Sequence, residues 1–366
     1  MSQKYTTTHY HNYLQLEKIL GAQQLKSASD SPPGAHDEML FIVIHQAYEL
    51  WFKQVIHELG SIAGIFAQQR VDERQMQKVV HRLNRVTEIQ KLLIQQVTVL
   101  ETLQPMEFLE FRDYLFPASG FQSFQFRVVE TMLGLRNEDR ITYNNQPFIH
   151  SLEPQQQETI QQLQQQRSVF SIVEEWLERT PFLAHPEFPF VQHYETAVKK
   201  MFEKEREQIM NSAFLGNDEK QLRLQILSGS EKYFEQMTNP EVYETARERK
   251  EIRLSYKAAM AALFIHLYHE EPILAQPYQF LGKIVEMDEL FTTWRYRHAQ
   301  MVMRMLGRKM GTGGSSGHDY LKETAARHQV FRDFHHISTL LVPRSYIPEL
   351  PGNLKKEMDF SFGRTA

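Results

Sequence analysis

The sequence predicts an all-α protein built as a single large helical domain. Apolar residues recur at helical spacing through most of the 366 residues, whereas the alternating pattern of strands is scarce. The segments with helical spacing include residues 38–59 and 86–100, and no internal repeat is present. A chain of this length can bury a substantial core. We therefore expect a helical core that contains the functional pocket.

The first long helix is expected at residues 38–59, after a loop at 27–34 that contains a Pro-Pro-Gly turn. Its first half is apolar almost all round, which predicts deep burial. A second helix is expected at 86–100. A third is predicted by an apolar stripe that consists of Phe121, Phe124, Val128 and Met132.

Residues 155–166 are rich in glutamine, and Pro154 before them favours an exposed helix. Residues 195–257 are more charged, and we expect a helical insertion there, a hairpin packed on the core. Residues 1–30 are expected to form an N-terminal arm and residues 352–366 a tail. The domain is thus predicted to span 1–366 with one elaboration in its middle.

Composition excludes several classes of function. Lys and Arg number 41 against 45 Asp and Glu, and without a basic stripe nucleic acid is not the expected partner. The chain has no cysteine, which excludes disulfides, thiolate metal sites, iron–sulfur clusters and covalent haem attachment. Residues 1–6 lack a signal core, and apolar runs such as 258–265 are too short to span a bilayer. We expect a cytoplasmic protein without a membrane partner.

Two histidines in apolar or aromatic surroundings are the candidate chemical groups. His298 shares a helical face with Trp294, Met301, Val302 and Met305, and a glycine-rich loop with hydroxyl side chains follows. Alone, His298 is more typical of a core histidine with a satisfied hydrogen bond than of a ligand. The loop favours a ligand beside a substrate clamp.

His45 lies within an apolar run and shares a face with Phe41, Tyr48 and Phe52. Burial disfavours the charged imidazolium, so the ring is expected to be neutral near pH 7. A core histidine bonded to a helix carbonyl remains the alternative. Because burying an unpaired imidazole is costly, two such residues favour a cofactor pocket, and we interpret the pocket as a non-covalent haem site.

Arg112 and Ser119 are further candidates. Arg112 stands among aromatic residues, and either it pairs with an acid such as Asp113 or it binds an anionic ligand. Ser119, with Gln122 three residues later, fits a capping box that opens the helix at Phe121.

Several motifs, in order along most of the chain, resemble the tryptophan 2,3-dioxygenase family. They lie at residues 10–14, 36–46, 49–51, 100–103, 111–113, 119–123, 294–298 and 311–317. The resemblance implies an all-helical haem protein that assembles as a homotetramer. By position, His298 would be the axial ligand of the haem iron and His45 the distal histidine that faces the indole N–H.

The resemblance also implies the contacts of the substrate and the haem. Arg112 would grip the substrate carboxylate, and Thr312 would hold its ammonium and carboxylate ends. Phe41 and Phe108 would wall the indole, although some members carry Tyr at position 108. The residues expected at the haem edge are Ser119 and Gly120. Those expected to reach the site of a neighbouring subunit are Tyr10, Tyr13 and Leu14.

The implied reaction opens the pyrrole ring of L-tryptophan, with both atoms of O2 entering N-formylkynurenine, the first step of tryptophan catabolism by the kynurenine route. Ferrous haem b would supply the oxygen chemistry. Two alternatives remain at this point. One is a haem enzyme that mono-oxygenates an indole or aromatic amino acid, and the other is a helical sensor that binds haem or tryptophan without catalysis.

Overall fold

Helices make up almost all of the regular structure in the computed structural model, which describes residues 7–30, 33–142, 147–307, 309 and 317–359. The all-α fold class is confirmed. The α-helices are α1 Tyr10–Leu14, α2 Leu16–Leu20, α3 Glu38–Phe66, α4 Glu73–Leu100, α5 Pro105–Arg112, α6 Phe124–Leu133, α7 Pro154–Gln164, α8 Val169–Glu178, α9 Phe190–Asn211, α10 Asn217–Thr238, α11 Pro240–Glu248, α12 Tyr256–Leu267, α13 Pro272–Leu306, α14 Gly317–Arg327, α15 Arg332–Ile337 and α16 Gly352–Met358.

Short elements connect these helices. Within the described ranges, the strands are an antiparallel pair, β1 Ala184–His185 and β2 Phe188–Pro189. The 3-10 turns are η1 Ser27–Ser29, η2 Asp113–Leu115, η3 Gly120–Gln122, η4 Phe148–Ser151, η5 Pro181–Leu183, η6 Ser338–Leu340 and η7 Arg344–Tyr346.

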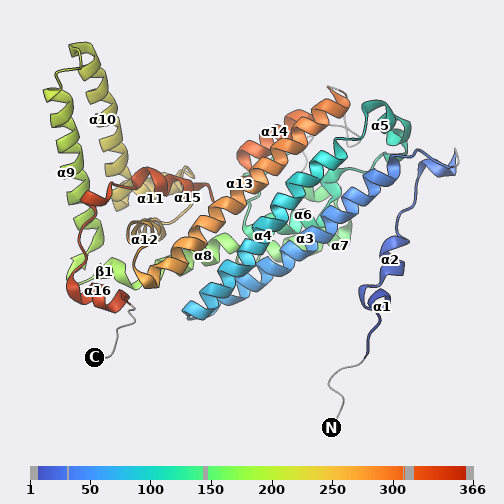
Figure 1. Cartoon of the computed structure of the whole chain (residues 1–366), viewed down its shortest axis with the longest axis horizontal. Coiled ribbons are helices and arrows are strands. Elements are labelled where there is room, and N and C mark those ends of the chain that lie inside the picture. Colours follow the sequence, from blue (N-terminus) through green and yellow to red (C-terminus); the bar gives the residue numbers. More distant parts are fainter. Residues whose placement is uncertain (1–6, 31–32, 143–146, 308, 310–316, 360–366) are drawn as a thin grey trace, which may run out of the picture.

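Three long helices, α3, α4 and α13, lie side by side and form the frame of the molecule (Figure 1). Helix α13 has 35 residues, which at 1.5 Å per residue is about 50 Å. Helix α4 begins at a capping box, in which Asp72 accepts the Gln75 amide and Gln75 accepts the Asp72 amide. Helices α6 and α14 pack against this frame and complete a bundle.

Apolar side chains at helical spacing fill the interior of the bundle. The fully buried ones include Val55 and Leu59 of α3, Val79 and Val86 of α4, and Leu281 of α13. The prediction that the first half of α3 is buried all round is wrong for this single chain. Met39, Val43 and Leu50 are exposed there because no described element covers that face of the helix.

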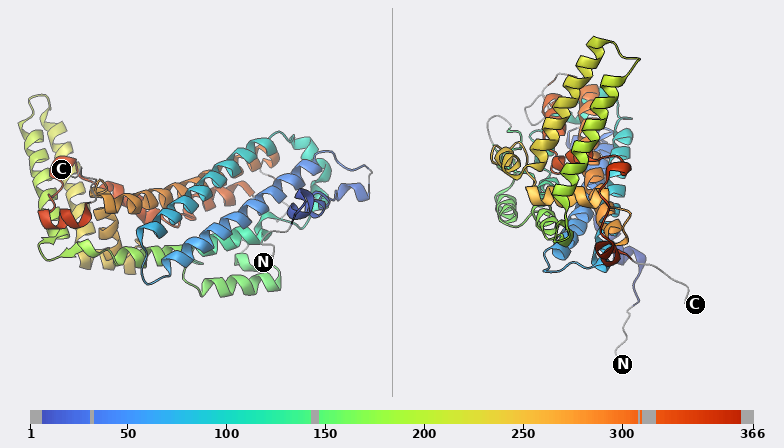
Figure 2. Two further views of the ribbon diagram at one scale, coloured as in Figure 1. Left: turned by 60° about the horizontal axis from the view of Figure 1, so that its bottom comes forward. Right: turned by 90° about the vertical axis from the view of Figure 1, so that its left-hand side faces the viewer.

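A hairpin of α9 and α10 projects from the far end of the bundle (Figures 1 and 2). It contains most of the charged stretch 195–257, and its first helix begins at Phe190, before the expected boundary. The expected packing on the core includes the base of the hairpin, where Tyr194 donates a hydrogen bond to the Leu340 carbonyl oxygen. The charged side chains of its outer part face solvent, which explains their abundance.

The two ends of the described chain differ. Helices α1 and α2 hang away from the bundle near the beginning of α3 (Figure 1), and neither contributes a buried residue. In contrast, Leu354 and Met358 of α16 are buried. The expected tail therefore begins with a helix that is part of the core.

Candidate active site

A cavity of about 260 Å³ lies at the end of the bundle where α3 begins and α4 and α13 finish. The predicted helical face of α13 is confirmed, because all five of its residues line the cavity: Trp294, His298, Met301, Val302 and Met305. The opposite side is formed by the beginning of α3 and by η3, and α14 covers one end. One cavity thus collects residues separated by up to about 290 positions in the sequence.

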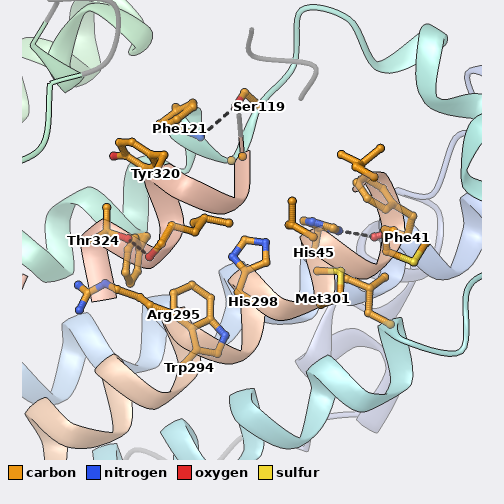
Figure 3. Close-up of a pocket in the computed structure, with 18 of the residues that line it drawn as sticks. Phe41, His45, Ser119, Phe121, Trp294, Arg295, His298, Met301, Tyr320 and Thr324 are labelled. Atoms are coloured by element: carbon orange, nitrogen blue, oxygen red, sulfur yellow. Dashed lines mark hydrogen bonds between the residues drawn. The ribbon is translucent and has the colours of Figure 1, made fainter. Parts of the chain in front are cut away.

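His298 projects into the middle of this cavity (Figure 3). Its ring lies 5.9 Å from the ring of Trp294, one turn earlier on α13. Burial, with a smaller contribution from nearby His45, lowers the pKa of His298 to about 4. The imidazole is therefore neutral at pH 7. It makes no hydrogen bond with any described residue, so a nitrogen lone pair is available to a ligand in the cavity.

His45 also lines the cavity, and its ring is held by its own helix. Its Nδ1 atom lies 2.7 Å from the carbonyl oxygen of Phe41. The ring keeps accessible surface because it faces the open cavity, yet surrounding protein atoms lower its pKa by desolvation. The Phe41 carbonyl and the Glu49 carboxylate offset only part of that effect. His45 is therefore neutral as well.

Aromatic rings form the wall beside His45. The ring of Phe41 lies 4.1 Å from His45 and 5.9 Å from Phe108, and Phe111 packs behind both phenylalanines. Such rings present a flat apolar surface that suits a planar aromatic ligand.

The turn that carries Ser119 and Gly120 lies on the same cavity. The predicted capping box is present, since Ser119 Oγ accepts the Phe121 amide and Gln122 accepts the Ser119 amide. It opens the 3-10 turn η3, however, not an α-helix. The extended backbone at Ser123 separates η3 from the next helix, so α6 begins only at Phe124.

The other predicted site residues that the structure describes do not line the cavity. Arg112 is partly buried at the end of α5, next to Phe111, and does not line the cavity. On α1, Tyr10 and Tyr13 are 70% and 74% exposed, and the half-buried Leu14 does not line the cavity. Thr312 lies outside the described residues.

A group of charged residues at one end of the cavity was not predicted from the sequence. Glu130, Arg127, Arg295 and His328 line it, and all four are buried. A signal was present in the apolar stripe of α6, where Arg127 and Glu130 are charged residues at helical spacing. Their partners come from distant segments, so spacing alone does not predict the group.

Glu49 was also missed, and it joins two walls of the cavity. One carboxylate oxygen accepts the Ser123 hydroxyl at 2.5 Å, and the other accepts the Gln125 side-chain amide at 3.0 Å. The Glu49 carbonyl accepts the same Gln125 amide at 2.7 Å. Because Glu49 follows His45 by one turn of α3, these bonds fix η3 relative to His45.

Comparison with known proteins agrees with this geometry. The profile of the tryptophan 2,3-dioxygenase family matches residues 2–341. The chain belongs to this family. Among relatives of that name, the protein from Bdellovibrio bacteriovorus is 46% identical over 98% of this chain and 100% of its own. The relative from Dictyostelium discoideum is 41% identical over 97% and 88%, and tryptophan 2,3-dioxygenase B from Danio rerio is 43% identical over 95% and 85%.

Membership of the tryptophan 2,3-dioxygenase family implies haem and the use of O2. The residues of the cavity fit a haem. His298 offers a neutral imidazole without a hydrogen-bond partner, the apolar walls suit a macrocycle, and arginines lie at one margin. In the described part of the chain, no helix combines the length and the apolar character needed to cross a membrane.

Proposed function

We propose that this chain is a cytoplasmic enzyme that opens the pyrrole ring of L-tryptophan and inserts both atoms of O2 to give N-formylkynurenine. This reaction is the first step of tryptophan catabolism by the kynurenine route. One observation carries the proposal: two neutral histidines with different hydrogen-bonding states, His45 and His298, line a single aromatic cavity. One histidine has its hydrogen bond within the protein and the other has none, so the two can bind different partners. Such a pair suits a site that holds an iron and an indole together.

His298 would hold the haem iron, since its ring is neutral and makes no hydrogen bond with a described residue. Because the chain has no cysteine for covalent attachment, the group would be haem b, active in the ferrous state. When bound, haem supplies the oxygen chemistry of the reaction. Ser119 and Gly120, on the turn η3, would contact its edge.

His45 would bind and orient the indole. A carbonyl oxygen can only accept, so the short contact with Phe41 requires a proton on Nδ1. In the neutral ring, Nε2 is then an acceptor suited to the indole N–H. Phe41 and Phe108 would cover the faces of the indole and exclude water from it.

Arg112 and Thr312 would bind the carboxylate and ammonium groups of the substrate. A guanidinium forms paired, charge-assisted hydrogen bonds with a carboxylate, which is the usual reason for arginine in an apolar setting. Arg112 follows Phe108 by one turn of α5, so both can act on the same ligand. A site that pairs with this end rejects an indole without it, because buried donors would lose their partners.

Assembly as a homotetramer, with the arm exchanged between subunits, would complete the pocket. Large apolar side chains are exposed on two neighbouring parts of the chain: Tyr10, Tyr13 and Leu20 on the arm, and Met39, Val43 and Leu50 on α3. Several large exposed apolar side chains support a protein contact at these parts of the chain. We propose that Tyr10, Tyr13 and Leu14 reach the site of the neighbouring subunit.

An absorption spectrum followed by a turnover assay tests this function. The purified protein, reduced and mixed with L-tryptophan under air, is expected to show a Soret band and to form N-formylkynurenine. A mono-oxygenated indole as the main product would contradict the reaction, and so would ligand binding without O2 consumption. In His298→Ala, we expect the Soret band to be lost while the far-UV circular dichroism of the helices is kept.

A further inference from the structure

The hairpin of α9 and α10 is held together by apolar side chains between its two helices. The buried ones include Phe202 and Ile209 of α9 and Leu227 and Phe234 of α10. The rings of Phe202 and Phe234 lie 5.2 Å apart, edge to face. Apolar residues on the other faces of α10 are therefore not required for the packing of the hairpin itself.

A second set of apolar residues lies on a face of α10 that the chain leaves open. Leu222 and Ile226 are 57% and 62% exposed, and Gly229 and Tyr233 continue the same face at helical spacing. Tyr233, nearest the base of the hairpin, is partly buried against the core. Scattered exposed apolar residues are ordinary, but these are aligned over about three turns. We call Leu222, Ile226, Gly229 and Tyr233 the α10 stripe.

Gly229 lies in the interior of α10, where glycine is unfavourable. It has more conformational freedom to lose than alanine, and it offers no side chain to the helix surface. A Cβ atom at position 229 would meet no described atom within 4 Å, so the described chain does not require glycine there. The missing side chain leaves a gap between Ile226 and Tyr233, into which a side chain of another helix can fit. The α10 stripe thus has the form of a helix-packing surface.

Charged residues beside the α10 stripe favour one orientation of a partner helix. Asp218 and Lys232 are nearly four turns apart, so they lie on the same flank of the stripe, at opposite ends. Neither forms a salt bridge within the described residues. On the other flank, Glu219 and Arg223 pair with each other. A parallel copy of α10 would bring equal charges together, whereas an antiparallel copy places Asp218 of each helix on the same flank as Lys232 of the other.

The apolar residues of the α10 stripe are complementary in the same arrangement. Ile226 and Gly229 are placed symmetrically about a point between positions 227 and 228, and so are Leu222 and Tyr233. In an antiparallel copy centred on that point, Ile226 of each helix enters the gap at Gly229 of the other. Leu222 then contacts Tyr233 of the other helix. One twofold axis satisfies both contacts, as a contact between identical chains requires.

We propose that the α10 stripe binds the same stripe of a second copy of this chain, with the two helices antiparallel. The contact is independent of the proposed reaction, because the hairpin projects from the end of the bundle away from the cavity (Figures 1 and 2). It involves few side chains and falls short of the roughly 1,000 Å² that a stable interface buries. We therefore expect a weak contact that adds to others between the subunits.

Cysteine cross-linking tests the contact, because the unmodified chain has no cysteine and gives no background. Full-length Ile226→Cys and Gly229→Cys chains, each with its own tag, are coexpressed and oxidised mildly. A disulfide requires Cα atoms about 4.4–6.8 Å apart, so the mixed pair should cross-link several-fold more than either variant with itself. Glu235→Cys, exposed on another face of α10, is the control and should cross-link only in traces.

Gly229→Ala separates the contact from the stability of the helix. The added methyl group meets no described atom and favours the helix, so the melting temperature should rise by about 1–3 °C. It also fills the gap for Ile226, so cross-linking of a Leu222→Cys and Tyr233→Cys pair should slow about 5-fold or more. Gly282→Ala changes an exposed glycine within α13 whose Cβ also meets no described atom, and it is the matched control. It should give a similar rise in melting temperature and leave cross-linking unchanged.

Exchange of the flanking charges tests the antiparallel orientation. Asp218→Lys and Lys232→Asp should each lower the yield of the mixed disulfide between positions 226 and 229 by about 2-fold or more, because each brings equal charges together. The two changes in the same chain should restore the yield. A double variant that stays as low as the single ones would contradict the charge pairing.

Three further results would overturn the proposal. Equal cross-linking of Glu235→Cys and of the mixed pair would show that the disulfides form by random collision. Ile226→Cys that cross-links to itself more than to Gly229→Cys would contradict the antiparallel arrangement. Cross-linking to a different protein, with none between copies of this chain, would assign the α10 stripe to another partner.

Discussion

The imidazole of His45 is fixed by the backbone of Phe41, one turn earlier on α3. The contact of 2.7 Å between Nδ1 and the carbonyl oxygen sets the tautomer, because only a protonated nitrogen can donate to a carbonyl. Desolvation lowers the pKa of the ring, so the neutral form with a basic Nε2 dominates at pH 7. The helix thus leaves Nε2 of His45 as a hydrogen-bond acceptor for a ligand in the cavity.

Replacing His45 with Ala is expected to remove one hydrogen bond to the indole. A neutral hydrogen bond contributes about 1 kcal/mol, so L-tryptophan affinity should fall about 3- to 10-fold. The benzothiophene analogue, which has sulfur in place of the indole N–H, should lose no affinity. Equilibrium titration of both ligands checks this difference, and an equal loss for both would show that His45 acts by packing alone.

Arg112→Ala is expected to weaken L-tryptophan binding by about 10- to 100-fold, the range for a charge-assisted hydrogen bond. Tryptamine lacks the carboxylate, and its weaker binding should be the same in the variant and the unmodified protein. The haem spectrum should not change. Unchanged affinity for L-tryptophan would refute the clamp.

The N-terminal arm is expected to act on a neighbouring subunit. Tyr13→Ala should keep haem and raise KM for L-tryptophan about 2- to 10-fold, since an aromatic contact contributes about 0.5–1.5 kcal/mol. Mixing Tyr13→Ala subunits with Arg112→Ala subunits should restore a fraction of unmodified sites, because each intact arm can pair with an intact pocket. Kinetics of the mixture that equal the average of the two variants would exclude arm exchange.

Glu49→Ala is expected to loosen η3 relative to α3, because three hydrogen bonds depend on this residue or its position. The free energy of unfolding should fall by about 1–3 kcal/mol, the cost of leaving partly buried donors without a partner. Urea denaturation measures this change. Glu88→Ala, which removes only an exposed pair with Lys91, is the matched control and should be nearly neutral. Equal effects of the two variants would show that Glu49 does not fix η3 relative to α3.

The lowered pKa of Glu130 should make the folded protein less stable at acidic pH. Burial alone raises its pKa, but the charges of Arg127, Arg140 and Arg295 and the His328 N–H outweigh burial and hold the pKa well below 4.5. The unfolded chain therefore takes up this proton first, so the contribution of Glu130 is complete above about pH 4.5 and is lost as the pH falls below that value. Melting temperatures of the protein and of Glu130→Gln should converge over that range, and a constant difference would contradict the assignment.

The fold and one face of the site could be predicted from the sequence because both depend on local periodicity. Trp294, His298 and Met301 share a face through helical spacing alone, and the structure confirms that this face lines the cavity. The burial of α3 was predicted wrongly for a related reason. Apolar residues such as Val43 indicate that a surface is covered, but they do not tell whether the same chain covers it.

The charged margin of the cavity could not be predicted in this way. Arg127 contacts Glu130 within one helix, whereas Arg295 and His328 reach the same carboxylate from positions 165 and 198 residues away. Only the packing of α6, α13 and α14 makes them neighbours. Thr312 lies outside the described residues, so its role stays a prediction from the resemblance.

Turnover under isotopically labelled O2 is the decisive test of the proposed reaction. The reduced, haem-loaded protein is mixed with L-tryptophan, and the product is analysed by mass spectrometry. We expect N-formylkynurenine in which both inserted oxygen atoms carry the label. A product with a single labelled oxygen, or no consumption of O2 although haem and L-tryptophan are bound, would contradict it.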